Sequence, residues 1–263
     1  MTVMFERLEL ENYRLFCGRH SMEFSPRLTS VRGESASGKT TLAEAIAWVL
    51  CDDIDVRCVG PRLGRDRLNA ELGGAGEANV AVSIRVEQTP ITVTRRVGGL
   101  RHAAWNHIFP PFIASLFFSS HVRERVVERA SWLLERFDPR DRHAVPGLFS
   151  EMYARLRGTG DGDVEVAVEP FSVRPMPESA QGQALINVSL AWAMAKASRA
   201  GLPFIYDEPL GVFDLEHRRS VEEHLLRGGD QVVVLGREGI PAEREYELEA
   251  SEQVAMTSLR GVK

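Results

Sequence analysis

A glycine-rich loop early in the chain has the residue types and spacing needed to hold a phosphate chain. Residues 33–40 read GESASGKT and match the pattern GxxxxGK[ST] at every fixed position. Glycines let the backbone wrap around phosphates with its N–H groups pointing inward, and a helix that starts at the loop adds its positive end. Lys39 would reach the β- and γ-phosphates, and Thr40 would offer its hydroxyl to Mg²⁺. The residues expected to hold the nucleotide at this loop are Gly33, Ser35, Ala36, Ser37, Gly38, Lys39, Thr40 and Thr41.

A second group of residues places two carboxylates directly after an apolar run. Residues 202–209 read LPFIYDEP. A buried strand that ends in an acidic pair is typical of a Walker B segment, in which Asp207 would hold Mg²⁺ and Glu208 would polarise the water that attacks the γ-phosphate of ATP. Taken alone, the pair is equally consistent with an acidic turn between a strand and a loop. Combined with the glycine-rich loop, it predicts ATP binding and hydrolysis.

A third stretch, SAQGQ at residues 179–183, lies between the other two in the sequence and would open a long helix. A hydroxyl and a glycine at a helix N-terminus can meet an anion. The stretch resembles the ABC signature, usually written LSGGQ, which binds the γ-phosphate of the ATP held by the partner subunit. Ser179, Gly182 and Gln183 match it, whereas Glu178 replaces the leucine and Gln181 the first glycine. Taken alone, the stretch is typical of a polar helix cap.

Two further stretches narrow the resemblance to the SMC, RecF and SbcC-like chromosome ATPases. Residues 11–16 (ENYRLF) are similar to the ENFRSF opening of these families, which implies that Arg14 contacts the nucleotide. Residues 207–218 (DEPLGVFDLEHR) resemble the D-x-P-L-G-x-L-D-x-x-H-R stretch of DndD, the ATPase linked to DNA phosphorothioation. By this resemblance Asp214 belongs to a D-loop and faces the partner subunit.

The chain departs from these families in three places. They carry a long coiled-coil arm, whereas residues 122–157 predict two short helices broken by Pro139 and Pro146, without an arm or a zinc hook. His121 stands where the Q-loop glutamine is expected, either as a catalytic group or as a polar loop residue. Gly236 and Arg237 stand where a switch histidine is expected. The last two changes predict slow turnover or an ATP-gated switch.

The rest of the pattern predicts the elements that position these residues. Alternating or continuous apolar runs predict strands at residues 4–11, 20–25, 28–32, 164–168, 203–206 and 231–235. Residues 79–87 and 91–97 predict an antiparallel hairpin around Thr89 and Pro90. Helical spacing predicts helices over residues 40–50, 122–137, 148–156 and 183–200.

We therefore expect an α/β fold, a P-loop ABC-type head with a RecA-like core. The ATP-binding lobe, with its antiparallel β subdomain, would comprise residues 1–105 and 201–263. A helical lobe that carries the signature would comprise residues 106–200. The two lobes would form one composite domain.

Composition and charge limit the function classes. The chain has 263 residues, enough for one large α/β domain or at most two small ones, and it is 44% hydrophobic and 26% charged. It has neither an apolar run near the roughly 18 to 20 residues of a membrane span nor a signal-peptide pattern, so a cytoplasmic location is expected. Its three cysteines form no CxxC pair, which disfavours a disulfide framework or a zinc site.

The net charge of -5 argues against a globally basic nucleic-acid surface. The arginines between residues 123 and 142 alternate with acidic residues, which favours a solvated helix face over a DNA-facing stripe. Direct DNA binding is left open.

These features predict an ATP-hydrolysing cassette, with ATP and Mg²⁺ as ligands, that forms a head-to-tail, ATP-dependent homodimer. The resemblance implies a role with partner proteins in DNA maintenance, modification or defence. One alternative is the nucleotide-binding subunit of a membrane transporter, which would normally show a Q-loop glutamine, an LSGGQ-like signature and a switch histidine. The other is a regulatory ATP-binding module that hydrolyses little.

Overall fold

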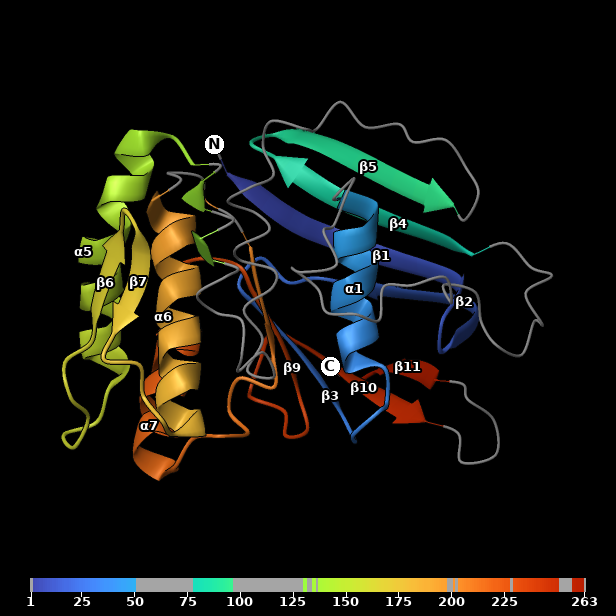
Figure 1. Ribbon diagram of the computed structural model, residues 1–263. Helices are drawn as coiled ribbons and strands as arrows, with labels where there is room; N and C mark the ends of the chain where they lie inside the picture. Colours follow the sequence, from blue (N-terminus) through green and yellow to red (C-terminus); the bar gives the residue numbers. More distant parts are fainter. Residues whose placement is uncertain are drawn as a thin grey trace.

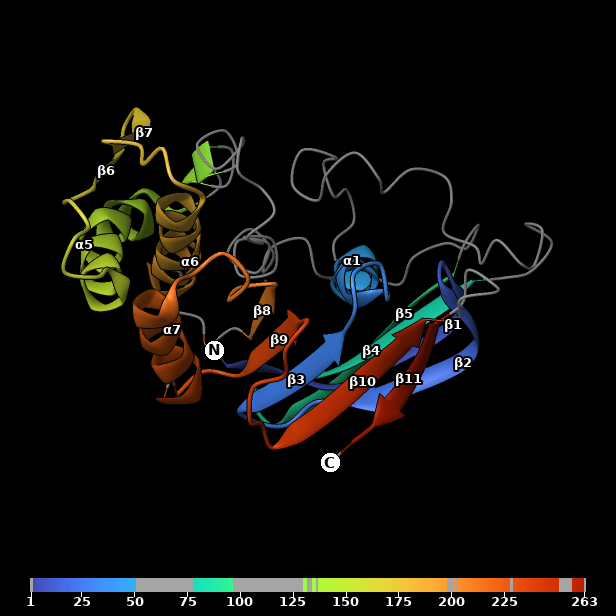
Figure 2. The ribbon, with the colours of Figure 1, turned by 90° about the horizontal axis from the view of Figure 1, so that it is seen from below.

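The computed structural model describes residues 2–50, 78–96, 130–131, 134–135, 137–197, 201, 203–227, 229–250 and 257–262. Two sheets form adjacent layers, and a group of helices lies to one side of them (Figures 1 and 2). The fold class is α/β, as predicted.

The first sheet is antiparallel, with the strand order β2-β1-β4-β5. Its strands are β1 (Val3–Tyr13), β2 (Phe16–Glu23), β4 (Asn79–Val86) and β5 (Thr89–Arg96). The predicted hairpin of β4 and β5 is confirmed, but its turn lies at Glu87 and Gln88. Pro90 belongs to β5, which is the last strand in this order, and an edge strand tolerates a residue that lacks a backbone N–H.

The second sheet has the order β11-β10-β3-β9-β8. Three of its strands, β3 (Leu28–Gly33), β9 (Val232–Gly236) and β8 (Phe204–Asp207), run parallel to each other. Parallel strands end at the same edge of a sheet. These three therefore deliver the glycine-rich loop, the acidic pair and residues 236–237 to one place.

Two strands that were not predicted complete the second sheet. β10 (Arg244–Ala250) pairs parallel to β3, and β11 (Thr257–Gly261) pairs antiparallel to β10. Tyr246 and Leu248 are the buried residues of β10. Its remaining side chains are exposed or half-buried, which leaves only a short apolar pattern in the sequence.

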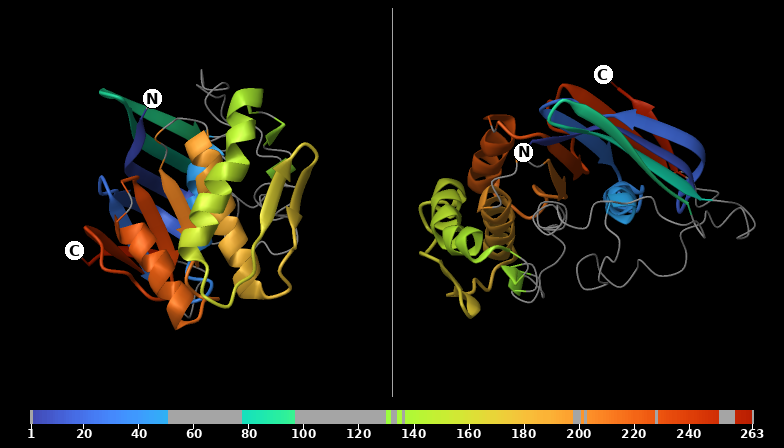
Figure 3. Two further views of the ribbon diagram at one scale, coloured as in Figure 1. Left: turned by 90° about the vertical axis from the view of Figure 1, so that its left-hand side faces the viewer. Right: turned by 90° about the horizontal axis from the view of Figure 1, so that it is seen from above.

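Helix α1 (Lys39–Leu50) lies against strands of both sheets (Figure 1). The other helices gather with the small hairpin of β6 (Glu165–Val168) and β7 (Phe171–Arg174), as Figure 3 shows from two sides. They are α5 (Pro139–Leu156), α6 (Ala180–Ala197) and α7 (Leu215–Arg227). Residues from most of the turns of α6 are buried, which makes it the central helix of this group.

The prediction that Pro146 breaks the helical pattern is wrong, whereas the break predicted at Pro139 is confirmed, since the described residues 135, 137 and 138 are not helical. Pro139 begins α5, where its missing N–H costs no hydrogen bond, and the carboxylate of Asp138 caps the helix by accepting from the backbone N–H of Arg140 at 2.9 Å. Pro146 lies inside the helix. Burial of the helix face on either side of it offsets the cost of an interior proline. The buried residues of this face are Val145, Phe149, Met152, Tyr153 and Leu156.

Candidate functional site

The glycine-rich loop joins β3 to α1, as predicted, and its backbone requires glycine. A side chain at Gly33 would meet the hydroxyl of Ser37 and lie 3.0 Å from the backbone oxygen of Leu248. Ala36 and Gly38 have positive φ angles of 64° and 100°, the left-handed conformation that curls a loop around a bound anion. Helix α1 begins at Lys39, directly after this loop.

Lys39 is folded onto the loop that precedes it. Its Nζ donates hydrogen bonds to the backbone oxygens of Gly33 at 2.5 Å and Glu34 at 2.8 Å, and lies 3.1 Å from Oε1 of Glu208. The side chains of Lys39 and Glu208 are only 6% and 15% exposed. A buried cation therefore faces the carboxylate that was predicted to activate water.

Thr40 and Asp207 meet beside this pair. The Thr40 hydroxyl donates to Oδ2 of Asp207 at 2.5 Å, and Asp207 is buried at the end of β8. A hydroxyl and a carboxylate are hard oxygen donors of the kind that Mg²⁺ binds in nucleotide sites. The two residues predicted as metal ligands therefore lie together and fit that ion.

Glu208 occupies a strained backbone position. Its φ is 51°, in the left-handed region that a non-glycine residue adopts at some cost, and such strain is commonest at functional sites. Its N–H donates to the backbone oxygen of Leu235 at 2.6 Å, which ties it to β9. Its Oε2 accepts from the backbone N–H of Arg237 at 3.2 Å. The carboxylate is thus held from two sides, by Lys39 and by Arg237.

Arg237 follows β9 at the position where a switch histidine was expected, and the structure brings it into the site. Its guanidinium Nη2 donates to the hydroxyl of Ser35 at 2.6 Å. Ser35, Glu208 and Arg237 line a cavity of about 430 Å³ beside the loop, together with residues 209–213. The site therefore holds a second cation, which the sequence did not indicate because arginine is not the residue expected there.

The SAQGQ stretch is the N-terminus of α6, as predicted. The Ser179 hydroxyl accepts from the N–H of Gly182 at 3.0 Å, which is the geometry of an N-cap, and the amide of Gln183 donates to the backbone oxygen of Pro177 at 3.0 Å. A Cβ at Gly182 would lie 2.5 Å from Cβ of Pro177, so only glycine fits there. Helices α6 and α1 lie on opposite sides of β8 in Figure 2.

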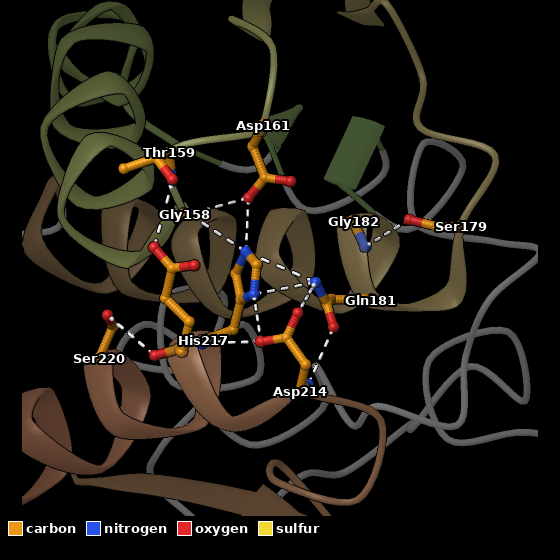
Figure 4. Close-up of polar contacts among 10 residues, drawn as sticks. Gly158, Thr159, Asp161, Ser179, Gln181, Gly182, Asp214, His217 and Ser220 are labelled. Atoms are coloured by element: carbon orange, nitrogen blue, oxygen red, sulfur yellow. Dashed lines mark hydrogen bonds and ion pairs between the residues drawn. The ribbon is translucent and has the colours of Figure 1, made fainter.

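Asp214 is bonded directly to the SAQGQ stretch (Figure 4). Its Oδ1 caps α7 by accepting the N–H of His217 at 3.0 Å. Its Oδ2 accepts from Nε2 of Gln181 at 3.2 Å, and its own N–H donates to Oε1 of Gln181 at 3.0 Å. The hydrogen bond from the His217 ring lowers the pKa of Asp214 to about 2. Gln181, which the sequence showed only as a departure from the signature pattern, therefore links the start of α6 to the segment between β8 and α7.

Arg14 lies against α1. It forms an ion pair with the buried carboxylate of Glu44, and the ring of its neighbour Tyr13 stacks on Trp48 with 5.4 Å between ring centres. The ENYRLF stretch is therefore packed on the helix that follows the glycine-rich loop. A contact between Arg14 and nucleotide stays a prediction.

Several features named from the sequence lie outside the described residues: His121, most of the helix expected over residues 122–137 and four of the arginines between residues 123 and 142. Of these arginines, Arg140 and Arg142 are described, and Arg142 bonds Glu169 at 3.1 Å and the backbone oxygen of Glu135 at 3.4 Å. The described segments of the chain contain no helix long and apolar enough to cross a membrane.

Comparison with known proteins identifies the fold. The family described as AAA domain matches residues 7–106, and a search of curated proteins finds no match. The solved SMC head bound to the C-winged helix domain of ScpA has a TM-score of 0.71 and 16% identity, over 98% of each chain. The SMC head domain from Thermotoga maritima gives 0.61 and 16%, over 98% of this chain and 99% of that one.

A third solved structure carries a coiled coil. It is the Smc head domain with an extended coiled coil, bound to the C-terminal domain of ScpA and derived from Pyrococcus furiosus; it gives a TM-score of 0.66 and 14% identity, over 99% of this chain and 96% of that one. The chain therefore has the fold of an SMC head, an ABC-type P-loop ATPase fold.

Proposed function

We propose that the chain binds and hydrolyses ATP and that ATP closes it into a head-to-tail dimer of two copies. The contact between Lys39 and Glu208, beside the bonded pair Thr40 and Asp207, carries the proposal. These four side chains combine a cation, a hydroxyl and two carboxylates at the open end of three parallel strands, which is the group set that phosphoryl transfer needs.

Lys39 binds the phosphates in this proposal. Its present partners are two neutral carbonyl oxygens and one carboxylate. A phosphate in the loop competes for the same ammonium with more negative charge, so Lys39 turns to the β- and γ-phosphates. Thr40 and Asp207 hold Mg²⁺, which when bound neutralises charge on those phosphates.

Glu208 activates the attacking water. Once Lys39 turns to the phosphate, the Glu208 carboxylate accepts a hydrogen bond from a water molecule and takes its proton. The water oxygen forms the new bond to the γ-phosphorus, and the bond from phosphorus to the ADP oxygen breaks. Arg237 contacts the γ-phosphate from the Ser35 side and takes the place of the missing switch histidine.

Ser179 and Asp214 complete the site of a second copy. Both are exposed on one side of the molecule, at the N-termini of α6 and α7, and two exposed apolar side chains flank them in sequence. Leu215, directly after Asp214, is 77% exposed, and Met176, shortly before Ser179, is 40% exposed. Exposed apolar side chains beside polar recognition groups suit a protein interface. Because each copy offers the same surface, the dimer contains two equivalent composite sites.

The likeness to DndD and to SMC heads supports a role in DNA maintenance, modification or defence. Two of the similar solved structures are SMC heads bound to ScpA, and we propose that this chain also acts with a protein partner. Residues 207–218 support the more specific comparison with DndD.

The test of the proposed function is ATP turnover by the whole chain and by Glu208→Gln. Removing the carboxylate while keeping its shape should lower turnover by about 100-fold or more, the usual effect of losing a general base. Glu208→Gln should also accumulate as an ATP-bound dimer in light scattering. Glu223→Gln, the same change on an exposed face of α7, is the matched control. Equal turnover in all three proteins would refute the proposal.

A further inference from the structure

A buried histidine next to the ATP site's partner-facing residues binds two carboxylates at once. His217 lies in the first turn of α7 and its side chain is 6% exposed. Its Nδ1 is 2.7 Å from Oδ1 of Asp214, and its Nε2 is 2.6 Å from Oδ2 of Asp161 (Figure 4). An ionised carboxylate can only accept, so both ring nitrogens must donate, and only the imidazolium form can do so.

Two further hydrogen bonds to the carboxylates agree with a charged ring. Oδ2 of Asp161 also accepts from the N–H of Gly158 at 2.9 Å. Oδ2 of Asp214 accepts from the amide of Gln181 at 3.2 Å. With an imidazolium at the centre, every donor of the cluster has an acceptor. The ring then joins residues 158–161 to the start of α7, and Asp214 in turn joins the start of α7 to Gln181 at the start of α6.

A neutral ring can accept a hydrogen bond from another donor within reach, and each of its two neutral forms loses the hydrogen bond to one of the carboxylates. If Nδ1 loses its proton, the amide of Gln181, 2.9 Å away, can donate to it, and Asp214 loses its bond to the ring. If Nε2 loses its proton, the N–H of Gly158, 3.1 Å away, can donate to it, and Asp161 loses its bond. Deprotonation therefore changes the partners of the cluster while leaving the histidine buried.

The charged groups around His217 favour the imidazolium. Asp161 reaches it from the loop after α5, where Arg157 and Asp163 pair with each other. Asp214 reaches it from the position directly before α7, and Gln181 of α6 is neutral. Glu216 of α7 accepts the backbone N–H of Thr159. Burial lowers the pKa of His217, but the hydrogen bonds to Asp161 and Asp214 outweigh it and raise the pKa above its ordinary value.

The direction of the pH effect follows from these shifts. Because the pKa of His217 is raised in the folded chain, its contribution to stability is complete below the ordinary histidine value and is lost as pH rises through the raised value. The pKa of Asp214 is lowered to about 2, so its contribution is complete above its ordinary value and lost only as pH falls through about 2. Solutions below the raised pKa of His217 therefore favour the joined cluster, and more alkaline solutions release it.

We propose that His217, as an imidazolium, is a positioning residue that holds Asp214 of the D-loop and Gln181 of the signature as one unit. Both segments then reach the second copy together, and alkaline pH weakens the ATP-bound dimer. The part of this inference that concerns the dimer rests on the proposed function. It also accounts for Gln181, since the glycine of the usual signature has no side chain that could bond Asp214.

The first experiment follows the His217 ring itself in the full chain without nucleotide. Its Cε1–H signal in NMR, assigned by its loss in His217→Asn, should titrate above the ordinary histidine value. Asp161→Asn removes one carboxylate and should move the midpoint down. A midpoint at or below the ordinary value, or one that Asp161→Asn leaves unchanged, would overturn the imidazolium, whether or not the chain forms dimers.

The second experiment measures ATP-dependent dimerisation against pH in the Glu208→Gln background, where ATP persists. Dimer affinity should fall about tenfold between pH 6 and pH 9, the equivalent of one charged hydrogen bond. With His217→Phe, affinity should be about tenfold lower at pH 6 and should not vary with pH, whereas nucleotide affinity of the single chain should stay the same. His143→Gln, at an exposed histidine of α5, is the matched control and should keep the pH profile.

The possible results separate this inference from the proposed function. A dimer with the same pH profile in Glu208→Gln and in the His217→Phe variant would overturn the role of His217 and leave the ATPase proposal standing. No ATP-dependent dimer at any pH would refute the dimer and with it the positioning role, while the NMR titration still decides the charge of the ring. If His217→Phe fails to fold by circular dichroism, His217→Asn, which keeps a donor toward Asp214, replaces it.

Discussion

Nζ of Lys39 lies 3.1 Å from Oε1 of Glu208, although the two residues are far apart in the sequence and on different elements. Lysine stands at the start of α1 and glutamate directly after β8. The two groups that the sequence assigned to phosphate binding and to water activation thus form an ion pair. In the proposed function, a phosphate that attracts Lys39 releases Glu208, which would couple ATP binding to the exposure of the base.

Lys39→Ala should abolish nucleotide binding in practice. It removes a buried ammonium that makes charged hydrogen bonds to phosphate, so affinity should fall by about 100-fold or more. Calorimetric titration with ATP measures this directly. Lys196→Ala is the matched control, because Lys196 pairs with Asp230 at 2.7 Å in the helical part of the chain. ATP affinity within twofold of the unmodified chain would refute the role of the glycine-rich loop.

Arg237→Ala should lower turnover about tenfold while changing ATP affinity by much less. The guanidinium that contacts Ser35 is lost, whereas the backbone N–H that holds Glu208 remains. One charged hydrogen bond to the γ-phosphate accounts for a change of that size. Steady-state kinetics separates kcat from KM, with Arg244→Ala as the control, since Arg244 pairs with Glu23 at 2.8 Å. An unchanged kcat would remove Arg237 from the site.

Gly182→Ala should destabilise the chain by about 1–3 kcal/mol, because a methyl group would overlap Pro177 at 2.5 Å. Gly147→Ala is the opposite case. Gly147 lies inside α5 with open space around it, so alanine should stabilise the chain by about 0.5–1 kcal/mol. Urea unfolding of both variants measures the two free energies. Equal stabilities would show that the start of α6 is not packed as described.

The elements that carry the ATP-site residues were predictable because their signals are local. The glycine-rich loop depends on φ angles and on small side chains, and β8 and β9 are short apolar runs, so neighbouring residues suffice to identify them. Strand β10 was not predicted, because Tyr246 and Leu248 are its two buried residues and leave only a short apolar pattern in the sequence. Pro146 shows the limit, since burial of the α5 face, which the sequence does not display, overrides the preference of proline.

The cluster around His217 could not be predicted from the sequence. Asp161, Gln181 and His217 come from three separate segments, and neither a glutamine in the signature nor a turn aspartate has a pattern that points to the others. The one local signal is an aspartate followed three residues later by the histidine, which is the spacing of a helix N-cap and its N3 residue. Asp214 and His217 have that spacing and that contact.

The central claim is that each ATP site is completed by a second copy of the chain. Ser179→Arg places a bulky cation on the surface that would meet the partner, so it should prevent ATP-dependent closure while the chain still binds ATP. Ser150→Arg puts the same side chain on an exposed face of α5 and should be silent.

Mixing Ser179→Arg with Lys39→Ala chains tests the composite site most directly. Each protein alone should be inactive, because both sites of its dimer carry a lesion. A mixed dimer has one site with both lesions and one with neither. An equal mixture of chains that pair at random, with sites that act independently, should therefore recover about one quarter of the normal ATP turnover. Recovery of that order is the predicted result. No recovery on mixing, together with normal turnover by Ser179→Arg alone, would contradict the composite site and leave the SAQGQ stretch as a helix cap.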